Sequence, residues 1–257
     1  MPLWYTEPIN IQSPLEIDGL IGWYNSNSAQ FSENNFLIRW NDLSYFKNHL
    51  VPYNNYSNIT SNFNFNNAVL TNEALLNLDT ISSGATIFIV GDLSNNTIDT
   101  SYFVSFFTNT FENNDQIDDL RISTRYDDGL SFLEVGNSFN NNAIGYINNT
   151  TQTKLINAVC FNKLYNNVNG LMYYSAGYIN NLNIVQSFEP SNITINMNNF
   201  NVFIGDYSNM QRTGHGINNK IFEVLLYNKV LLQNDITFIN RYLANKHNIN
   251  LNNNFIY

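Results

Sequence analysis

Short strand-like patterns, separated by clusters of Asn, Ser, Gly and Asp, make up most of the chain. In residues 120–126, apolar and polar side chains alternate, which is typical of a strand with one buried face. Residues 85–90 and 102–107 are apolar on both faces, as expected for strands in the middle of a sandwich. The Asp-Asp-Gly sequence at 127–129 indicates a hairpin that pairs the preceding strand with residues 130–135. The sequence therefore predicts an all-β domain with two antiparallel sheets.

One segment near the C-terminus departs from this pattern. From Asn234 to Lys246, four apolar side chains recur at helical spacing. They are Ile236, Ile239, Tyr242 and Leu243. We predict a single amphipathic helix, with Asn234 as its N-cap and with Lys246 and His247 in its last turn.

The first residues differ from the rest because three of the five prolines fall within them, at Pro2, Pro8 and Pro14. Proline fixes φ and removes a backbone donor, so residues 1–17 are predicted to form an extended arm. The arm precedes a domain at 18–251 and a short tail at 252–257. Its apolar side chains need a cover, either on their own domain or on a neighbouring protein, and are the predicted partner-binding residues. They are Trp4, Tyr5, Ile9 and Ile11.

The composition limits the kinds of partner. The net charge is -9, a field that repels phosphate backbones, so no nucleic acid partner is expected. Only 12% of the residues are charged, and 52 asparagines provide much of the polar surface. Such uncharged polar surfaces suit copies of a protein packed side by side.

The lone cysteine, Cys160, excludes an internal disulfide framework. Strand alternation places it on one face with Ile156 and Ala158, which predicts a small buried hydrophobic side chain. The N-terminus has no basic and apolar signal-peptide pattern, and no window approaches the ~18 apolar residues of a membrane span. Neither a signal peptide nor membrane insertion is expected.

Four segments carry a resemblance to a known family. They are Gly-Leu-Ile-Gly-Trp-Tyr at 19–24, Arg-Trp-Asn-Asp-Leu-Ser at 39–44, the apolar run at 221–231 and Tyr-Leu-Ala-Asn-Lys at 242–246. In this order they resemble the laminin-G-like, concanavalin-A-like lectin and glucanase family. The resemblance implies a two-sheet jelly-roll sandwich over residues 18–250, a fold that hosts sugar binding, adhesion and virion surface roles.

The sequence departs from that family after Ser44. The family usually has a Gly-rich turn there, whereas this chain has Tyr45 and Phe46. We expect these two aromatic residues to form a contact surface.

Glucan-cutting members of the fold carry Glu-x-Asp-x-Glu on one strand, where the three carboxylates share a face. This chain has Glu16 and Asp18 but Leu20 in the third position. The pattern predicts no catalysis.

Ligand and metal candidates lie on loops. His49, His215 and His247 are too far apart in sequence to suggest a zinc site, and no cofactor is expected apart from calcium. An oxygen-rich loop is the calcium candidate, the alternative being an ordinary acidic loop; its residues are Glu112, Asp115, Asp118 and Asp119. The candidates for ligand contact are Tyr53, Tyr56, Asp206 and His215, for which core packing or plain surface turns are the alternative.

These features together favour a non-enzymatic structural protein of a virus, a capsid or tail decoration assembled in the host cytoplasm, with other virion proteins or its own copies as partners. A free carbohydrate-binding lectin or adhesin, with glycans as partners, is the alternative. A glycoside hydrolase is the third hypothesis.

Overall fold

The computed structural model of the 257-residue chain has two large antiparallel sheets and one α-helix in its described part. The residues described are 13–34, 37–52, 68–69, 84–92, 101–108, 119–127, 130–136, 143–148, 154–166, 170–179, 182–187, 200–204 and 220–251. The chain is thus an all-β sandwich with one helix, as the strand periodicity predicted.

Six strands form the first sheet, in the order β1-β15-β6-β11-β12-β13. Their bounds are Leu20–Asn25 (β1), Lys220–Tyr227 (β15), Gly84–Asp92 (β6), Lys154–Asn166 (β11), Gly170–Ile179 (β12) and Leu182–Ser187 (β13). The first strand of the sheet therefore pairs with the last one along the chain, and β15 separates β1 from the central β6.

The second sheet has seven strands, in the order β10-β9-β8-β7-β14-β5-β4. Their bounds are Ala143–Asn148 (β10), Leu130–Gly136 (β9), Asp119–Asp127 (β8), Ser101–Thr108 (β7), Phe200–Ile204 (β14), Ala68–Val69 (β5) and Val51–Pro52 (β4). A separate two-stranded ribbon joins Ala29–Phe31 (β2) to Leu37–Trp40 (β3). Short 3-10 turns lie at Pro14–Glu16 (η1) and Ser26–Ser28 (η2).

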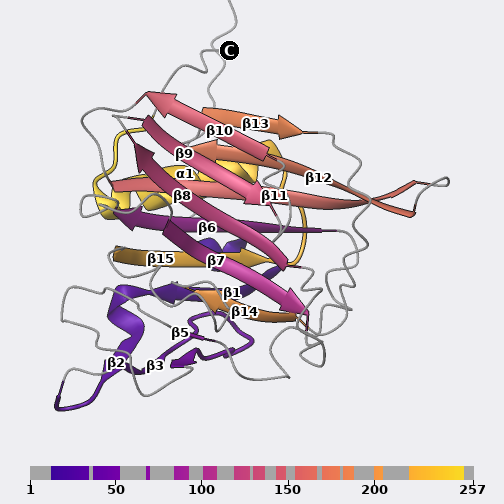
Figure 1. The fold of residues 1–257 in the computed structure, drawn as a ribbon. Helices are drawn as coiled ribbons and strands as arrows, with labels where there is room; N and C mark the ends of the chain where they lie inside the picture. The colour runs from indigo at the N-terminus through magenta and orange to yellow at the C-terminus, as the bar shows by residue number, and fades with distance from the viewer. Residues whose placement is uncertain are drawn as a thin grey trace, which may run out of the picture.

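The layers explain why β6 is apolar on both faces. Figure 1 shows the seven-stranded sheet in front of the six-stranded sheet, with the helix behind both. Phe88 and Val90 belong to the core cluster that includes the helix, whereas Ile87 and Ile89 point to the opposite face. All four side chains are buried. The prediction of a strand buried on both faces is confirmed for residues 85–90, whereas for 102–107 only the backbone, in β7, is described.

The predicted hairpin is also present. Asp127 of β8 pairs with Leu130 of β9, so two residues connect the strands. This agrees with the Asp-Asp-Gly signal, because Asp-Gly is a sequence favoured in two-residue hairpin turns.

The helix, α1, spans Gln233–His247. Ile236, Ile239 and Leu243 are buried against the six-stranded sheet, as their spacing predicted. The predicted N-cap is wrong. Ile236 N already donates to Leu232 O, so the helix begins two residues earlier than expected, with Leu232 as a cap that makes no side-chain hydrogen bond.

Residues 13–17 of the predicted arm are within the described part. Ile17 is buried in the core cluster, and the hydroxyl of Tyr227 donates to Pro14 O at 3.2 Å. This stretch thus packs on its own domain. Trp4, Tyr5, Ile9 and Ile11 lie outside the described residues, as does the tail at 252–257.

Candidate functional site

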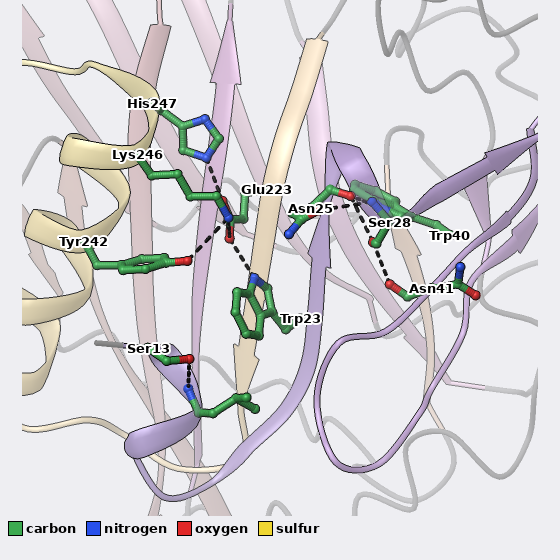
Figure 2. Close-up of polar contacts among 11 residues, drawn as sticks. Ser13, Trp23, Asn25, Ser28, Trp40, Asn41, Glu223, Tyr242, Lys246 and His247 are labelled. Atoms are coloured by element: carbon green, nitrogen blue, oxygen red, sulfur yellow. Dashed lines mark hydrogen bonds and ion pairs between the residues drawn. The ribbon is translucent and has the colours of Figure 1, made fainter. Parts of the chain in front are cut away.

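The strongest candidate for a binding surface is the segment Asn41–Leu50, called here the 41–50 loop. It follows β3 and returns beside it, because Trp40 and Leu50 form an antiparallel bridge with hydrogen bonds of 2.8 and 2.9 Å. Trp40 is fully buried, and its Nε1 donates to Asn25 O at 2.6 Å (Figure 2). Both ends of the loop are therefore fixed to the sandwich.

Asp42 holds the inside of the loop. Its carboxylate is buried and accepts hydrogen bonds from the backbone N–H of Trp23, Ser44 and Asn48 at 2.7 to 2.8 Å. It also accepts one from the Ser44 hydroxyl at 2.6 Å. A carboxylate that accepts several backbone donors gives a strong, charge-assisted network. The Trp-x-Asp-x-Ser pattern of the sequence is thus the pattern of a rigid loop.

The tip of this loop presents two aromatic side chains to solvent. Tyr45 is 78% exposed and Phe46 is 61% exposed. Large apolar side chains displayed side by side on an ordered loop are typical of a contact surface. The structure agrees with the expectation that these residues, which replace the Gly-rich turn of the resembling family, lie at the surface.

Lys47 follows the aromatic pair with φ of 57°, in the left-handed region. This conformation costs roughly 1 kcal/mol or more for a residue with a Cβ atom. We expect Lys47→Gly to raise the free energy of unfolding by about 0.5 to 1 kcal/mol, since glycine tolerates this φ. Urea denaturation would measure the change. The matched control is Asn248→Gly, at φ of 55°, where asparagine is already tolerated and a smaller gain is expected; destabilisation by Lys47→Gly alone would contradict the prediction.

Positive charge gathers beside the loop. Arg39 is on β3, one residue before the Trp40 bridge, and His49 precedes the bridged Leu50. The Nδ1 of His49 accepts from Asp42 N at 3.1 Å. Burial and the nearby charge of Arg39 lower the pKa of His49, whereas Asp42 acts in the opposite direction. Arg39, Lys47 and His49 are therefore close enough to share one electrostatic environment.

A second polar cluster joins β1, β15 and α1, as Figure 2 shows. At its centre, the fully buried Glu223 carboxylate accepts from Trp23 Nε1 at 2.6 Å, Lys246 Nζ at 2.8 Å and His247 Nε2 at 2.6 Å. Lys246 also lies over the rings of Trp23 and Tyr242, with Nζ 5.6 and 5.5 Å from the centroids. We call these five residues the Glu223 cluster. Its one carboxylate is enclosed by donors, so the cluster serves to hold the last helix onto the first strand.

Burial raises the pKa of Glu223, but hydrogen bonds from His247 and Lys246 outweigh it, and the net pKa lies below the ordinary 4.5. A depressed carboxyl pKa adds stability that is present above the unfolded-state value and is lost as the pH falls through the folded-state value. We expect the urea midpoint to drop as the pH falls below about 4.5. In Glu223→Gln this drop should be smaller, and an unchanged pH profile would contradict the assignment.

Sequence reasoning missed the Glu223 cluster. A signal was available, since Glu223 is the one charged residue within the apolar run 221–227 and Lys246 and His247 end the only helical pattern. A charged residue in a strand that is apolar on both faces has a buried side chain, and a buried charge needs a partner of opposite charge.

The other predicted site residues fall almost entirely outside the part of the chain that the structure describes. Tyr53, Tyr56, Asp206, His215, Glu112, Asp115 and Asp118 lie outside the described residues, and for Asp119 only the backbone, at the start of β8, is described. Among the side chains that are described, no group of three or more His, Cys, Asp or Glu could hold a metal ion. Asp18 is 96% exposed and pairs with Lys229 at 3.0 Å.

Cys160 is buried, as predicted, and burial raises the pKa of its thiol to about 11. Such a thiol is unreactive near neutral pH. In the described part of the chain, no helix is long and apolar enough to cross a membrane.

No family model and no curated protein matches the chain. Solved structures do share its fold. The sialidase of Trypanosoma rangeli in complex with sialic acid aligns at a TM-score of 0.59 and 12% identity, over 91% of this chain and 34% of that one. The complex of the same sialidase with 2,3-difluoro-KDN aligns at a TM-score of 0.59 and 11% identity, over 93% of this chain and 36% of the sialidase. A CBM40 module of a Ruminococcus gnavus IT-sialidase aligns at a TM-score of 0.41 and 13% identity, over 62% of this chain and 83% of the module.

The chain spans about a third of the length of the Trypanosoma sialidases that it matches. The likeness shows a β-sandwich of the kind found in lectins and glycosidases, and it does not single out the laminin-G-like family. Identity this low concerns the fold alone.

These neighbours correct two expectations. A virion structural protein with virion partners is not supported, because the neighbours are sialidases. The expectation of a non-enzymatic protein is contradicted by the same structures, since sialidases are glycoside hydrolases. That expectation depended on the missing third carboxylate after Glu16 and Asp18, but sialidases use a tyrosine nucleophile, so the carboxylate pattern is not diagnostic for them.

Proposed function

We propose that the chain is a carbohydrate-binding domain built on a laminin-G-like jelly roll. The observation that carries the proposal is the exposed Tyr45–Phe46 pair on a loop held rigid by Asp42. Aromatic faces bind the apolar faces of sugar rings, while polar groups around them bind the hydroxyls.

The rigidity of the 41–50 loop is the second observation that supports carbohydrate binding. Binding by a flexible loop loses affinity because the loop must be ordered, whereas a loop fixed in advance avoids that loss. The bridge between Trp40 and Leu50, the Asp42 network and the bond from Asn48 Nδ2 to Ile21 O at 2.9 Å all fix the 41–50 loop before any ligand arrives.

The test is a glycan array probed with the full chain and with the double variant Tyr45→Ala/Phe46→Ala. We expect the double variant to lose at least about tenfold in affinity, which corresponds to ~1.4 kcal/mol of stacking. Leu232→Ala is the matched control, because Leu232 is also a large exposed apolar residue but lies before α1. Binding that survives in the double variant, or no glycan binding by the wild type, would refute the proposal.

Glycoside hydrolysis is the second candidate, and the observation that favours it is the alignment of nearly the whole chain with sialidases. Its test is the release of free sialic acid from sialyllactose by the purified chain. Release at the rate of the buffer blank would exclude it.

A further inference from the structure

The 41–50 loop carries positive charge in a chain whose net charge is -9. Arg39 and Lys47 are two of only 11 basic residues. In the part of the chain that the structure describes, neither makes an ion pair, and the Arg39 Nε has no hydrogen-bond partner. Among the described residues, the cations that pair with carboxylates lie elsewhere, at Lys229 and in the Glu223 cluster.

Asp42, the buried acid of the loop, forms no ion pair with either cation among the described residues. The Asp42 carboxylate is buried and accepts four hydrogen bonds, three from the loop and one from Trp23 of β1, so its lone pairs are directed inward. A negatively charged group that approaches the aromatic pair from solvent therefore meets the charge of the exposed Lys47 first, while the partly buried Arg39, whose Nε is shielded from solvent, adds its charge from beside His49.

The course of the backbone places positive charge beside the aromatic pair. Lys47 directly follows Phe46, and the Trp40–Leu50 bridge brings Arg39 beside the returning end of the loop. A guanidinium matches a carboxylate through two parallel hydrogen bonds, which it cannot do with a neutral hydroxyl.

We infer that the 41–50 loop selects glycans bearing a carboxylate, with the sugar ring on Tyr45 and Phe46 and the carboxylate beside Arg39 and Lys47. This inference rests on the proposed carbohydrate-binding function. A sialic acid at the end of a glycan has the required chemistry, a compact ring that carries one carboxylate.

The experiment titrates the full chain with 3′-sialyllactose and with lactose, its neutral counterpart. We expect about fivefold tighter binding of sialyllactose, since an ion pair at an exposed site adds modestly to affinity. Arg39→Gln and Lys47→Asn, the latter chosen because asparagine tolerates the left-handed φ, should each reduce this preference and leave lactose binding within about twofold. Circular dichroism and the urea midpoint check that each variant folds; if Arg39→Gln does not fold, Lys47→Asn alone carries the test.

The outcomes separate this inference from the proposed function. Equal binding of the two sugars, or a preference that persists in Lys47→Asn, overturns the acidic-sugar assignment while carbohydrate binding stands. Equally tight binding of a sulfated lactose overturns the assignment to a carboxylate. Failure of every glycan to bind overturns both.

Discussion

Glu223→Ala is expected to lower the free energy of unfolding by about 3 to 5 kcal/mol, because removing one partner of a buried ion pair leaves the others without compensation. Trp23 Nε1, Lys246 Nζ and His247 Nε2 all lose their acceptor. Lys246 is 28% exposed and can turn toward water, so the lower end of this range is expected. Urea denaturation monitored by tryptophan fluorescence would measure the change.

The matched control for this variant is Asp18→Asn. Asp18 also pairs with a lysine at 3.0 Å, but it is exposed, and an exposed ion pair contributes little. We expect its urea midpoint to match that of the wild type. Equal destabilisation by the two substitutions would show that the Glu223 cluster has no special role.

Asp42→Ala should destabilise the protein by about 3 kcal/mol and loosen the 41–50 loop, because buried donors that lose their acceptor cost about 1 to 3 kcal/mol each. Three of these donors are backbone N–H groups, of Trp23, Ser44 and Asn48, which no rotamer change can redirect. Hydrogen exchange of the Trp23 and Asn48 amides should become faster than exchange in β6.

Ser44→Ala is the graded control, since it removes one side-chain donor to Asp42 and the acceptor of Phe46 N but leaves the three backbone bonds to Asp42. A loss of about 1 kcal/mol is expected for it. If Asp42→Ala changed stability no more than Ser44→Ala, the loop would not depend on the buried carboxylate.

Local patterns predicted the local structure well. The two-residue hairpin between β8 and β9 and the helix near 234–246 depend on neighbours in sequence, where turn residues and apolar spacing are direct physical signals. The helix start was missed because Leu232, which has no capping side chain, begins it through a backbone bond alone.

Contacts distant in sequence could not be predicted in the same way. Trp23 and Glu223 are 200 positions apart and meet only because β1 pairs with β15. Arg39 comes near His49 only through the bridge between Trp40 and Leu50, which no periodicity indicates. The exposure of Tyr45 and Phe46 could be predicted because two bulky residues replaced an expected turn.

The pairing of β1 with β15 also determines when the chain can fold during synthesis. β1 is made first, yet its only hydrogen-bonded neighbour in the described sheets begins at Lys220, and the helix that seals it ends at His247. Until the ribosome has made β15, Leu20, Ile21 and Tyr24 lack the strand beside which they are buried. Long-range pairing of this kind slows folding and leaves apolar strands open to other chains, so the nascent protein depends on the later synthesis of β15 and α1 to protect β1 from aggregation.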